Sequence, residues 1–301
     1  MTTAAEPRPA QLPLPGGSPG ATVKLYPLLS GTALVPLGWL EREEGRMAGL
    51  HAVGIGVPKE DRVEIPVIAF MVEHPSAGVV LIDTGLHPSV AVDPKKNLGR
   101  IASLFLPGVR MKPEDAVSAQ LRARGIDHGD VKLVIMTHLH FDHASAISEF
   151  PEATFVVTSG EWHAATQPRG WQHGYRRQHF DHAFDYRLLD FDAREVDSYE
   201  TFGRSIDLLG DGSVRVVYTP GHTEGHMSVI LRLSGGEALV AGDAIYTRGS
   251  LERGVMPFRA EDEHVFRRSL KEIQLYNETR DALIIPGHDM AFWKTLKPEY
   301  G

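Results

Sequence analysis

The sequence predicts a mixed α/β domain built on two β-sheets. Short apolar runs, which are typical of buried strands, fall into two sets along the chain. The first set comprises residues 67–72, 79–82, 131–136 and 155–158, and the second comprises residues 214–218, 228–233 and 238–241. A chain of 301 residues is within the size that one layered α/β core supports. We therefore expect a single domain over residues 22–301, with the strand sets forming two packed sheets.

Two helices are predicted between and after these strands. Pro113 opens a stretch that ends at Gly125, with proline suited to the first turn, acidic residues at 114–115 favourable at the N-terminus, and glycine suited to the stop. Residues 263–277 carry Phe266, Leu270 and Ile273 at helical spacing. That apolar stripe predicts a helix packed against the core.

Residues 1–21 differ in composition from the rest of the chain. They are rich in Pro, Ala and Gly and lack the apolar run that a signal peptide or a membrane helix requires. We interpret them as a flexible leader, and we expect a cytoplasmic protein without a membrane partner. The net charge of -8 argues against a nucleic-acid partner, because phosphate backbones call for a basic surface.

One short run of residues carries most of the chemical information. Directly after the apolar stretch 131–136, residues 137–143 read Thr-His-Leu-His-Phe-Asp-His. A strand end followed by a turn lets its polar side chains converge on one side. Four polar groups crowded there need a common partner to offset their desolvation, so a polar turn with incidental histidines is the weaker interpretation. The run predicts a metal site.

Three further turns supply the remaining metal ligands. His222, Asp243 and His288 each follow an apolar run and lie in a glycine-containing turn. Either histidine alone would be interpreted as an ordinary loop residue, but together with the first run they indicate one shared site. Five histidines and two aspartates suffice for two metal ions, with one aspartate bridging them. The chain has no cysteine, and nitrogen and oxygen ligands suit Zn²⁺, with Fe, Co or Mn as alternatives.

These motifs resemble those of the metallo-β-lactamase superfamily, and they are most similar to its N-acyl-homoserine lactonases. The similarity begins near Lys24, passes through Leu81-Ile-Asp-Thr-Gly85 and the four ligand turns, and ends near Tyr300. Residues 137–143 are specific to the superfamily, whereas Gly242-Asp-Ala-Ile-Tyr246 points to the lactonases. The resemblance implies a four-layer αββα sandwich with two metal ions at one sheet edge.

The resemblance also implies a role for each site residue. His138, His140 and His222 would hold the first metal ion, Asp142, His143 and His288 the second, and Asp243 would bridge them. A hydroxide between the metals would open the lactone ring of N-acyl-homoserine lactones, which is a quorum-quenching activity. Tyr246 matches the family's active-site tyrosine and would donate to the oxyanion, unless it is a plain core aromatic. Asp142 would return a proton to the leaving alkoxide.

Residues around the ligands divide into supporting and pocket-lining candidates. We expect Asp83 and His226 to hold the ligands from behind, with a turn cap and simple packing as the respective alternatives. The expected walls of the substrate pocket are Phe141, Trp39, Met47, Leu104 and Phe105. Residues 93–111 are apolar in part, and we expect them to serve as a lid, a pocket wall or a contact in a homodimer. A loose run of histidines over residues 163–182 is expected to be a solvated loop.

Other functions with the same metal core stay open. The substrate could be another lactone, or a thioester of the glyoxalase II type, although that type carries an additional C-terminal region and only residues 290–301 follow the last ligand. β-Lactamases with a cysteine ligand are excluded by composition. A metal-binding module without turnover belongs to a different class, and no ligand is missing that would favour it.

Overall fold

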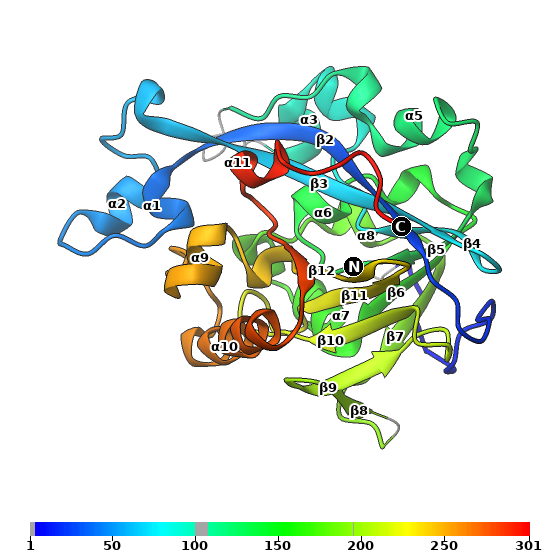
Figure 1. Cartoon of the computed structure of the whole chain (residues 1–301). Coiled ribbons are helices and arrows are strands. Elements are labelled where there is room, and N and C mark those ends of the chain that lie inside the picture. The colour runs from blue at the N-terminus through cyan, green and yellow to red at the C-terminus, as the bar shows by residue number, and fades with distance from the viewer. Residues whose placement is uncertain (1–3, 100–107, 195) are drawn as a thin grey trace.

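The structure, a computed structural model, describes residues 4–99, 108–194 and 196–301. Its strands form two sheets that pack face to face (Figure 1). The first sheet contains Arg8–Pro9 (β1), Lys24–Pro36 (β2), Arg62–His74 (β3), Gly78–Ile82 (β4), Val131–Ile135 (β5), Thr154–Thr158 (β6) and Asp185–Leu189 (β7). The second sheet contains Asp197–Tyr199 (β8), Phe202–Asp207 (β9), Val214–Tyr218 (β10), Met227–Leu233 (β11), Gly236–Val240 (β12) and Ala282–Ile285 (β13).

The strand order places the two expected strand sets in separate sheets. It is β1-β7-β6-β5-β4-β3-β2 in the first sheet and β13-β12-β11-β10-β9-β8 in the second. β4 to β7 run parallel to one another, and β12 pairs in parallel with β13. β11 is antiparallel to both β10 and β12, so β10, β12 and β13 all point the same way. Their carboxyl ends therefore meet at one edge.

Helices cover the outer faces of both sheets. The α-helices are Leu37–Leu40 (α1), Ala48–Ala52 (α2), Pro94–Leu98 (α3), Val117–Arg122 (α5), Phe141–Ala144 (α6), Ser159–Thr166 (α7), Arg177–Phe180 (α8), Arg248–Arg253 (α9), Glu263–Thr279 (α10) and Met290–Trp293 (α11). Short 3₁₀ turns occur at Lys59–Asp61 (η1), Pro88–Ala91 (η2), Pro113–Asp115 (η3), His128–Asp130 (η4), Ile147–Glu149 (η5), Gly170–His173 (η6) and Gly242–Ala244 (η7). Among the described residues, none of the helices has the length and apolar character needed to cross a bilayer.

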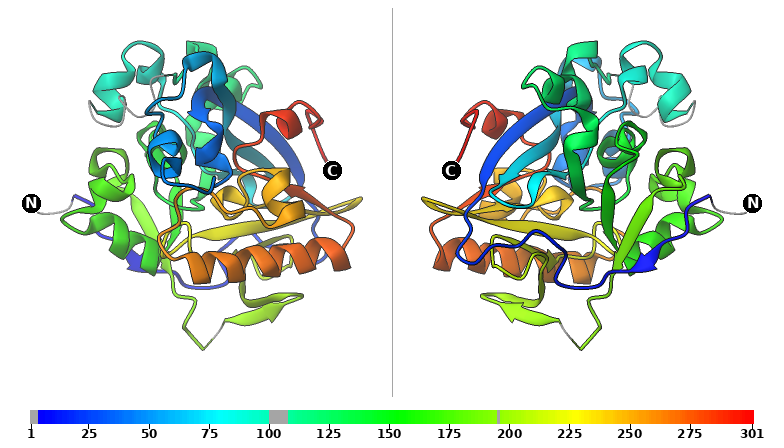
Figure 2. Two further views of the ribbon diagram at one scale, coloured as in Figure 1. Left: turned by 90° about the vertical axis from the view of Figure 1, so that its left-hand side faces the viewer. Right: turned by 90° about the vertical axis from the view of Figure 1, so that its right-hand side faces the viewer.

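Three apolar layers hold the sandwich together. Between the sheets, Phe70 and Ile135 of the first sheet pack in one cluster with Val216 and Val229 of the second. Beyond the first sheet, residues of α5 to α8 join an outer cluster. Beyond the second sheet lies α10 (Figure 2), and its apolar stripe, which contains Phe266, packs in a third cluster as expected. The architecture is the four-layer αββα sandwich of the metallo-β-lactamase fold, as the resemblance implied.

The helix expected over residues 113–125 is interrupted. The side chain of Asp115 accepts a hydrogen bond from the backbone N–H of Lys112, which closes a 3₁₀ turn over Pro113–Asp115. Ala116 is then extended, with φ -55° and ψ 134°, and α5 starts after it. Gly125 has φ 77°, a left-handed conformation that suits glycine after the helix, so the predicted stop is confirmed.

The expectation of a flexible leader is wrong for residues 4–21. β1 pairs in parallel with β7, and the backbone N–H of Leu14 donates to the carbonyl of Leu208 over 2.7 Å. The Leu14 side chain is 8% exposed and belongs to the core between the sheets. Figure 2 shows this dark-blue segment running from one sheet to the other. Its composition has no strand period, but pairing with an edge strand needs only free backbone groups.

Candidate metal centre

The ligand turns meet at the edge where strands of both sheets end. His138 and His140 follow β5, and Asp142 and His143 lie in α6, directly after them. His222 follows β10, Asp243 lies in η7 after β12, and His288 follows β13. The two sheets join here, because the backbone N–H of Met227 donates to the carbonyl of Thr137 over 3.0 Å. All seven expected ligands are therefore brought together.

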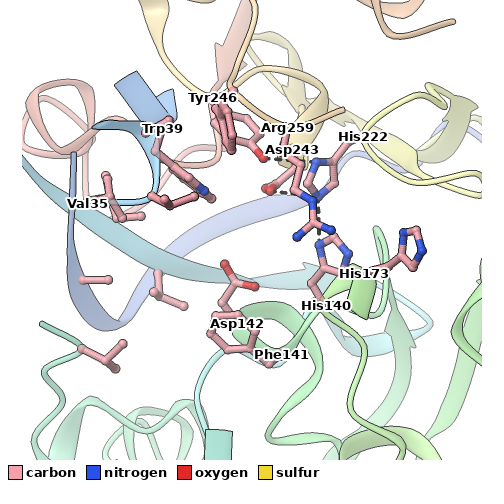
Figure 3. Close-up of a pocket in the computed structure, with 18 of the residues that line it drawn as sticks. Val35, Trp39, His140, Phe141, Asp142, His173, His222, Asp243, Tyr246 and Arg259 are labelled. Atoms are coloured by element: carbon pink, nitrogen blue, oxygen red, sulfur yellow. Dashed lines mark hydrogen bonds and ion pairs between the residues drawn. The ribbon is translucent and has the colours of Figure 1, made fainter. Parts of the chain in front are cut away.

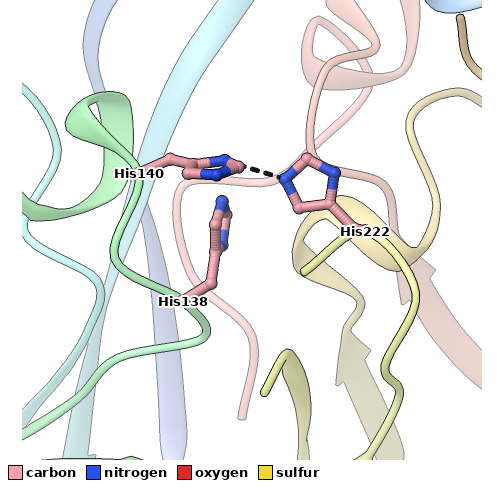
Figure 4. A group of neighbouring side chains, drawn as sticks. All are labelled: His138, His140 and His222. Atoms are coloured by element: carbon pink, nitrogen blue, oxygen red, sulfur yellow. Dashed lines mark hydrogen bonds between the residues drawn. The ribbon is translucent and has the colours of Figure 1, made fainter. Parts of the chain in front are cut away.

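Three imidazole rings form the first cluster (Figure 4). His138, His140 and His222 each offer a ring nitrogen, and these nitrogens lie within 4.8 Å of one another. Nδ1 of His140 is 3.0 Å from Nε2 of His222. The rings stand nearly perpendicular to one another, with interplanar angles of 82° to 88°. Such an arrangement points the lone pairs of three rings at a common point.

A carboxylate and two imidazoles form the second cluster, which Asp243 joins to the first. Oδ2 of Asp142 lies 3.8 Å from Nε2 of both His143 and His288. Oδ1 of Asp243 is 3.2 Å from Nε2 of His143, and its Oδ2 is 3.2 Å from Nε2 of His288 and of His222. A single buried carboxylate thus contacts ligands of both clusters, as a bridging ligand must.

Buried polar atoms without partners gather at this centre. Among the described residues, Nε2 of His138, Nε2 of His143 and Oδ1 of Asp243 are buried and make no hydrogen bond, although the last two atoms lie 3.2 Å apart. Each such atom costs about 1–3 kcal/mol when it is left unsatisfied. Divalent cations would satisfy all three atoms, and nitrogen and carboxylate donors are ligands that such cations accept. The residues therefore fit metal binding.

The electrostatics of the first cluster favour ligation. Burial, followed by the neighbouring imidazoles, holds the pKa of His138 well below its usual range, and burial lowers the pKa of His140 to about 4. Burial likewise lowers the pKa of His222, although Asp243 opposes the shift. All three rings are therefore neutral near neutral pH and keep a lone pair free, which is the state that binds a metal ion.

The second cluster is rich in negative charge. Burial lowers the pKa of His143, but Asp142, Asp83 and Asp243 outweigh burial and raise that pKa well above its usual range. Burial would raise the pKa of Asp243, yet His288, His222 and His143 hold it well below its ordinary value. Asp243 is therefore a carboxylate at neutral pH. This part of the site attracts cations.

The second ring nitrogen of most ligand histidines has a partner, which fixes the ring and its tautomer. These contacts are His138 Nδ1 with Thr137 Oγ1 (3.1 Å), His143 Nδ1 with Asp83 Oδ2 (2.8 Å), His222 Nδ1 with Tyr246 Oη (3.1 Å) and His288 Nδ1 with the carbonyl of Pro66 (3.2 Å). In each case the remaining nitrogen faces the centre. The rings are preorganised by their surroundings.

Asp83 and His226 lie behind the ligands, where the sequence placed them. Asp83 accepts 2.8 Å hydrogen bonds from His143 and from both the backbone N–H and the hydroxyl of Thr137. It has φ 58°, a left-handed conformation that is rare for aspartate. Nε2 of His226 accepts a 3.0 Å hydrogen bond from the backbone N–H of Asp243, and burial lowers the pKa of His226 to about 3. Neutral His226 thus holds the Asp243 turn.

Glu161 is a supporting residue that the sequence analysis missed. Its buried carboxylate accepts hydrogen bonds from the backbone N–H of Leu139 (2.8 Å) and from the hydroxyl of Thr223 (2.6 Å). It therefore ties the turn of His138 to the turn of His222. The available signal was Thr158-x-x-Glu161, which resembles a helix capping box. Thr158 does cap α7, but the Glu161 side chain turns to the ligand turns instead.

A cavity of about 440 Å³ opens beside the two clusters (Figure 3). Its polar end is formed by His140, Asp142, His222, Asp243 and Tyr246, and the rest of its lining is mostly apolar. Tyr246 is 1% exposed, and burial raises the pKa of its phenol well above the usual value. The phenol is therefore protonated and able to donate a hydrogen bond at neutral pH.

Two of the expected pocket-wall residues lie at this cavity. Trp39 and Phe141 line the cavity, and the ring of Trp39 lies 5.1 Å from that of Tyr246. The expectation for Met47 is wrong, because its side chain is 51% exposed in the turn before α2 and lies outside the lining. Leu104 and Phe105 lie outside the described residues.

Two lining segments were not expected from the sequence. Gln172 and His173 in η6, and Arg259 in the loop before α10, lie at the cavity. His173 was expected in a solvated loop, and its side chain is 51% exposed, with Nδ1 3.0 Å from Oε1 of Glu261. His179 was placed there too, yet it is 2% exposed and its Nε2 lies 3.1 Å from the carbonyl of Asn97. Loop residues without periodicity gave no signal for either position.

Comparison with other proteins gives a consistent result. The metallo-beta-lactamase superfamily profile matches residues 63–288. The N-acyl homoserine lactonase AttM of Agrobacterium fabrum is 33% identical over 283 residues, covering 92% of this chain and 98% of AttM. The N-acyl homoserine lactonase AiiA of Bacillus thuringiensis subsp. kurstaki is 28% identical over 244 residues, covering 79% of this chain and 88% of AiiA.

Solved structures share the fold. An N-acyl homoserine lactone hydrolase with the product N-hexanoyl-L-homoserine at its catalytic metal center has a TM-score of 0.72 at 24% identity, covering 93% of this chain and all of that one. AidC, a dizinc quorum-quenching lactonase, has a TM-score of 0.58 at 14% identity, covering 89% of this chain and 88% of AidC. With the profile match over three quarters of the sequence and a 33% identical relative along nearly its whole length, the chain belongs to the metallo-beta-lactamase superfamily.

Proposed function

We propose that this protein hydrolyses the lactone ring of N-acyl-homoserine lactones and thereby quenches quorum signals. The observation that carries the proposal is the pair of joined clusters at the polar end of a largely apolar cavity. A lactone ring attached to an acyl chain has the same division into a polar and an apolar part. Relatives named N-acyl homoserine lactonase, at 33% identity over most of the chain, support the same substrate class.

Two divalent cations fit the centre, with Zn²⁺ the best match to its donors. His138, His140 and His222 would hold one cation, Asp142, His143 and His288 the other, and Asp243 both. When bound, two such cations supply hydroxide at neutral pH and polarise an ester carbonyl. Support for this number of metals comes from the two clusters themselves and from AidC, which is described as a dizinc lactonase.

Tyr246 would stabilise the oxyanion that forms when the ring is attacked. If Nε2 of His222, which faces His140, binds a metal ion, Nδ1 of His222 carries the proton and donates to the Tyr246 oxygen 3.1 Å away. The phenol O–H then points toward the polar end of the cavity, where the Asp243 carboxylate also lies, and would turn to the oxyanion when substrate is bound. One preorganised donor of this kind contributes about 3 kcal/mol to transition-state stabilisation.

Asp142 would complete the reaction by handing a proton to the leaving alkoxide. Its side chain is 14% exposed and lies in the cavity wall, whereas the side chain of Asp243, which also lines the cavity, is 3% exposed and contacts three ligand histidines. Breaking the ring C–O bond creates an alkoxide and a carboxylic acid at the polar end. Asp142, positioned there, takes the proton of the new carboxylic acid and passes it to the alkoxide, so the opened product leaves as a carboxylate with a free hydroxyl.

The apolar part of the cavity would hold the acyl chain. Val35, Trp39, Ile65 and Phe141 contribute to this wall. Each methylene group buried against such a wall contributes about 0.8 kcal/mol to binding. Chains long enough to reach these side chains would therefore bind more tightly than very short ones.

Mass spectrometry of the products tests this function. The zinc-loaded protein is incubated with N-hexanoyl-homoserine lactone, with a plain γ-lactone and a thioester run in parallel. We expect one product that gains the mass of one water and returns to the lactone in acid. Release of hexanoate with an intact homoserine lactone would show amide cleavage, and turnover of the thioester alone would show a different substrate class. Either result would contradict the proposal.

A further inference from the structure

Arg259 places a cationic hydrogen-bond donor in the cavity beside the candidate metal centre. It lines the same cavity as His140, His222 and Tyr246, and Figure 3 shows its guanidinium at the polar end. One of its nitrogens, Nη2, donates to the carbonyl of Gln172 over 2.7 Å. Within the described residues, no carboxylate oxygen lies within 4.0 Å of this guanidinium. Because a guanidinium has five N–H donors, most of its donors are available to a ligand.

The position of Arg259 is fixed from two sides. The neighbouring Phe258 donates its backbone N–H to the carbonyl of Trp39 over 3.0 Å, and Arg42 binds the carbonyls of Pro257 and Phe258. On the other side, Glu261 pairs with His173 and accepts from the backbone N–H of Glu224 over 3.1 Å. A donor on a held loop loses less conformational freedom when it binds a ligand.

Arg176, the other arginine of the lining, is placed differently. Its guanidinium packs closely on the backbone of Gly99, where a Cβ atom would lie 2.9 Å from Nη1. Arg259, by contrast, lies at the polar end of the cavity, near His140 and His222 (Figure 3). Of these two lining arginines, Arg259 is therefore the one suited to a substrate group near the lactone ring.

Resting on the function proposed above, we infer that Arg259 determines specificity by donating a hydrogen bond to the amide carbonyl oxygen of the substrate. The ring would lie at Tyr246 and the metal centre, and the acyl chain along the apolar wall. The amide is the polar group that lies between those two parts. Its carbonyl would lose its water in the cavity, and a charged donor replaces that water. A plain γ-lactone with an alkyl side chain has no such oxygen and gains nothing from Arg259.

Two lactones with a five-atom side chain on the ring carbon next to the carbonyl measure this contribution. N-butanoyl-homoserine lactone carries the amide, whereas α-pentyl-γ-butyrolactone does not. For Arg259→Ala we expect the ratio of kcat/KM between the two substrates to fall by about 10- to 100-fold, mostly through KM, which is the range of one hydrogen bond from a charged donor. Arg259→Gln can still donate to the Gln172 carbonyl, so it separates loss of substrate binding from loss of the loop contact. It should reduce the ratio as well, by a smaller factor.

The matched control is Arg267→Ala, which removes an exposed arginine on α10 outside the cavity lining. It should leave both substrates unchanged. A second readout avoids turnover: Arg259→Ala should weaken binding of N-butanoyl-2-aminocyclopentanone, which keeps the amide but lacks the ring ester, by a similar factor. An unchanged ratio, or an equal loss on both lactones, would overturn the inference. If the parent protein opened neither lactone, the proposed function would have failed instead.

Discussion

Asp83 holds His143 from behind through a 2.8 Å hydrogen bond to Nδ1, while Nε2 of the same ring faces Asp243. The same carboxylate binds the backbone and hydroxyl of Thr137, whose hydroxyl is 3.1 Å from Nδ1 of His138. One aspartate thus orients rings of both clusters. It does so from a left-handed backbone conformation, a strain that the surrounding hydrogen bonds offset.

Asp83→Asn should weaken metal binding without unfolding the protein. The three hydrogen bonds from His143 and Thr137 use both carboxylate oxygens, and an amide keeps only one acceptor oxygen, so the ligand rings are held less firmly. We expect metal affinity to fall by about 10- to 100-fold, measured by competition with a chromogenic chelator. Asp281→Asn, a change at an exposed aspartate outside the site, is the control. Equal affinities for Asp83→Asn and the parent would show that Asp83 only shapes its turn.

Tyr246→Phe tests the proposed oxyanion donor. Removing the hydroxyl should lower kcat on N-acyl-homoserine lactones by about 100-fold, with a smaller change in KM. Because burial keeps the phenol pKa well above its usual value, the loss should be the same from mildly acidic to mildly alkaline pH. If kcat/KM on every lactone matched the parent, Tyr246 would be a packing residue instead.

The sequence specified the ligands far better than the pocket. His138, His140 and Asp142 were identifiable because a strand end followed by a tight turn leaves few other uses for such spacing. Each later ligand, such as His222, followed a recognisable buried strand. The cavity walls depend on how loops fold back, which no local pattern encodes. Met47 was expected in the wall and lies outside it, whereas Arg259 lines the cavity and was not expected there. Glu161 was missed because its local pattern predicts a different hydrogen bond.

Trp39 and Met47 provide a paired test of the cavity wall. Trp39→Ala should lower kcat/KM for long-chain lactones by about tenfold more than for short-chain ones, because it removes contact with one or two methylene groups. Met47→Ala should leave the chain-length profile unchanged, since Met47 is 51% exposed outside the lining. A steady-state series over acyl-chain length measures both variants. A parallel loss at every length in Trp39→Ala would mean that this residue acts only through the adjacent ring of Tyr246.

The raised pKa of buried Glu161 leads us to expect a pH-dependent contribution to the free energy of unfolding. Burial raises its pKa from 4.5 to about 7, so the folded state prefers the protonated acid. This stabilisation is present below pH 4.5 and is lost as pH rises through about 7. Glu161→Gln stays neutral, so its unfolding free energy relative to the parent should rise by about 3 kcal/mol over that range. Urea unfolding of both metal-loaded proteins measures the difference, and a difference independent of pH would contradict the assignment.

As with the site, some parts of the fold could be predicted from the sequence and others could not. Buried strands such as β5 and β10 carry apolar runs, and α10 carries a clear stripe, so both were expected. The segment around Leu14 was not expected to be ordered. It is held by backbone pairing and by one buried leucine, and neither feature produces a periodic pattern.

The most direct test of the metal-dependent lactonase is proton release from N-hexanoyl-homoserine lactone while Zn²⁺ is titrated into metal-stripped protein. Ring opening produces an acid, so a pH-stat records turnover without a coupled assay. We predict no proton release by the stripped protein. The rate of release should then rise to a plateau at about two equivalents of metal, as a dinuclear centre requires. Undiminished release from fully stripped protein, or none at any metal content, would contradict the proposed function.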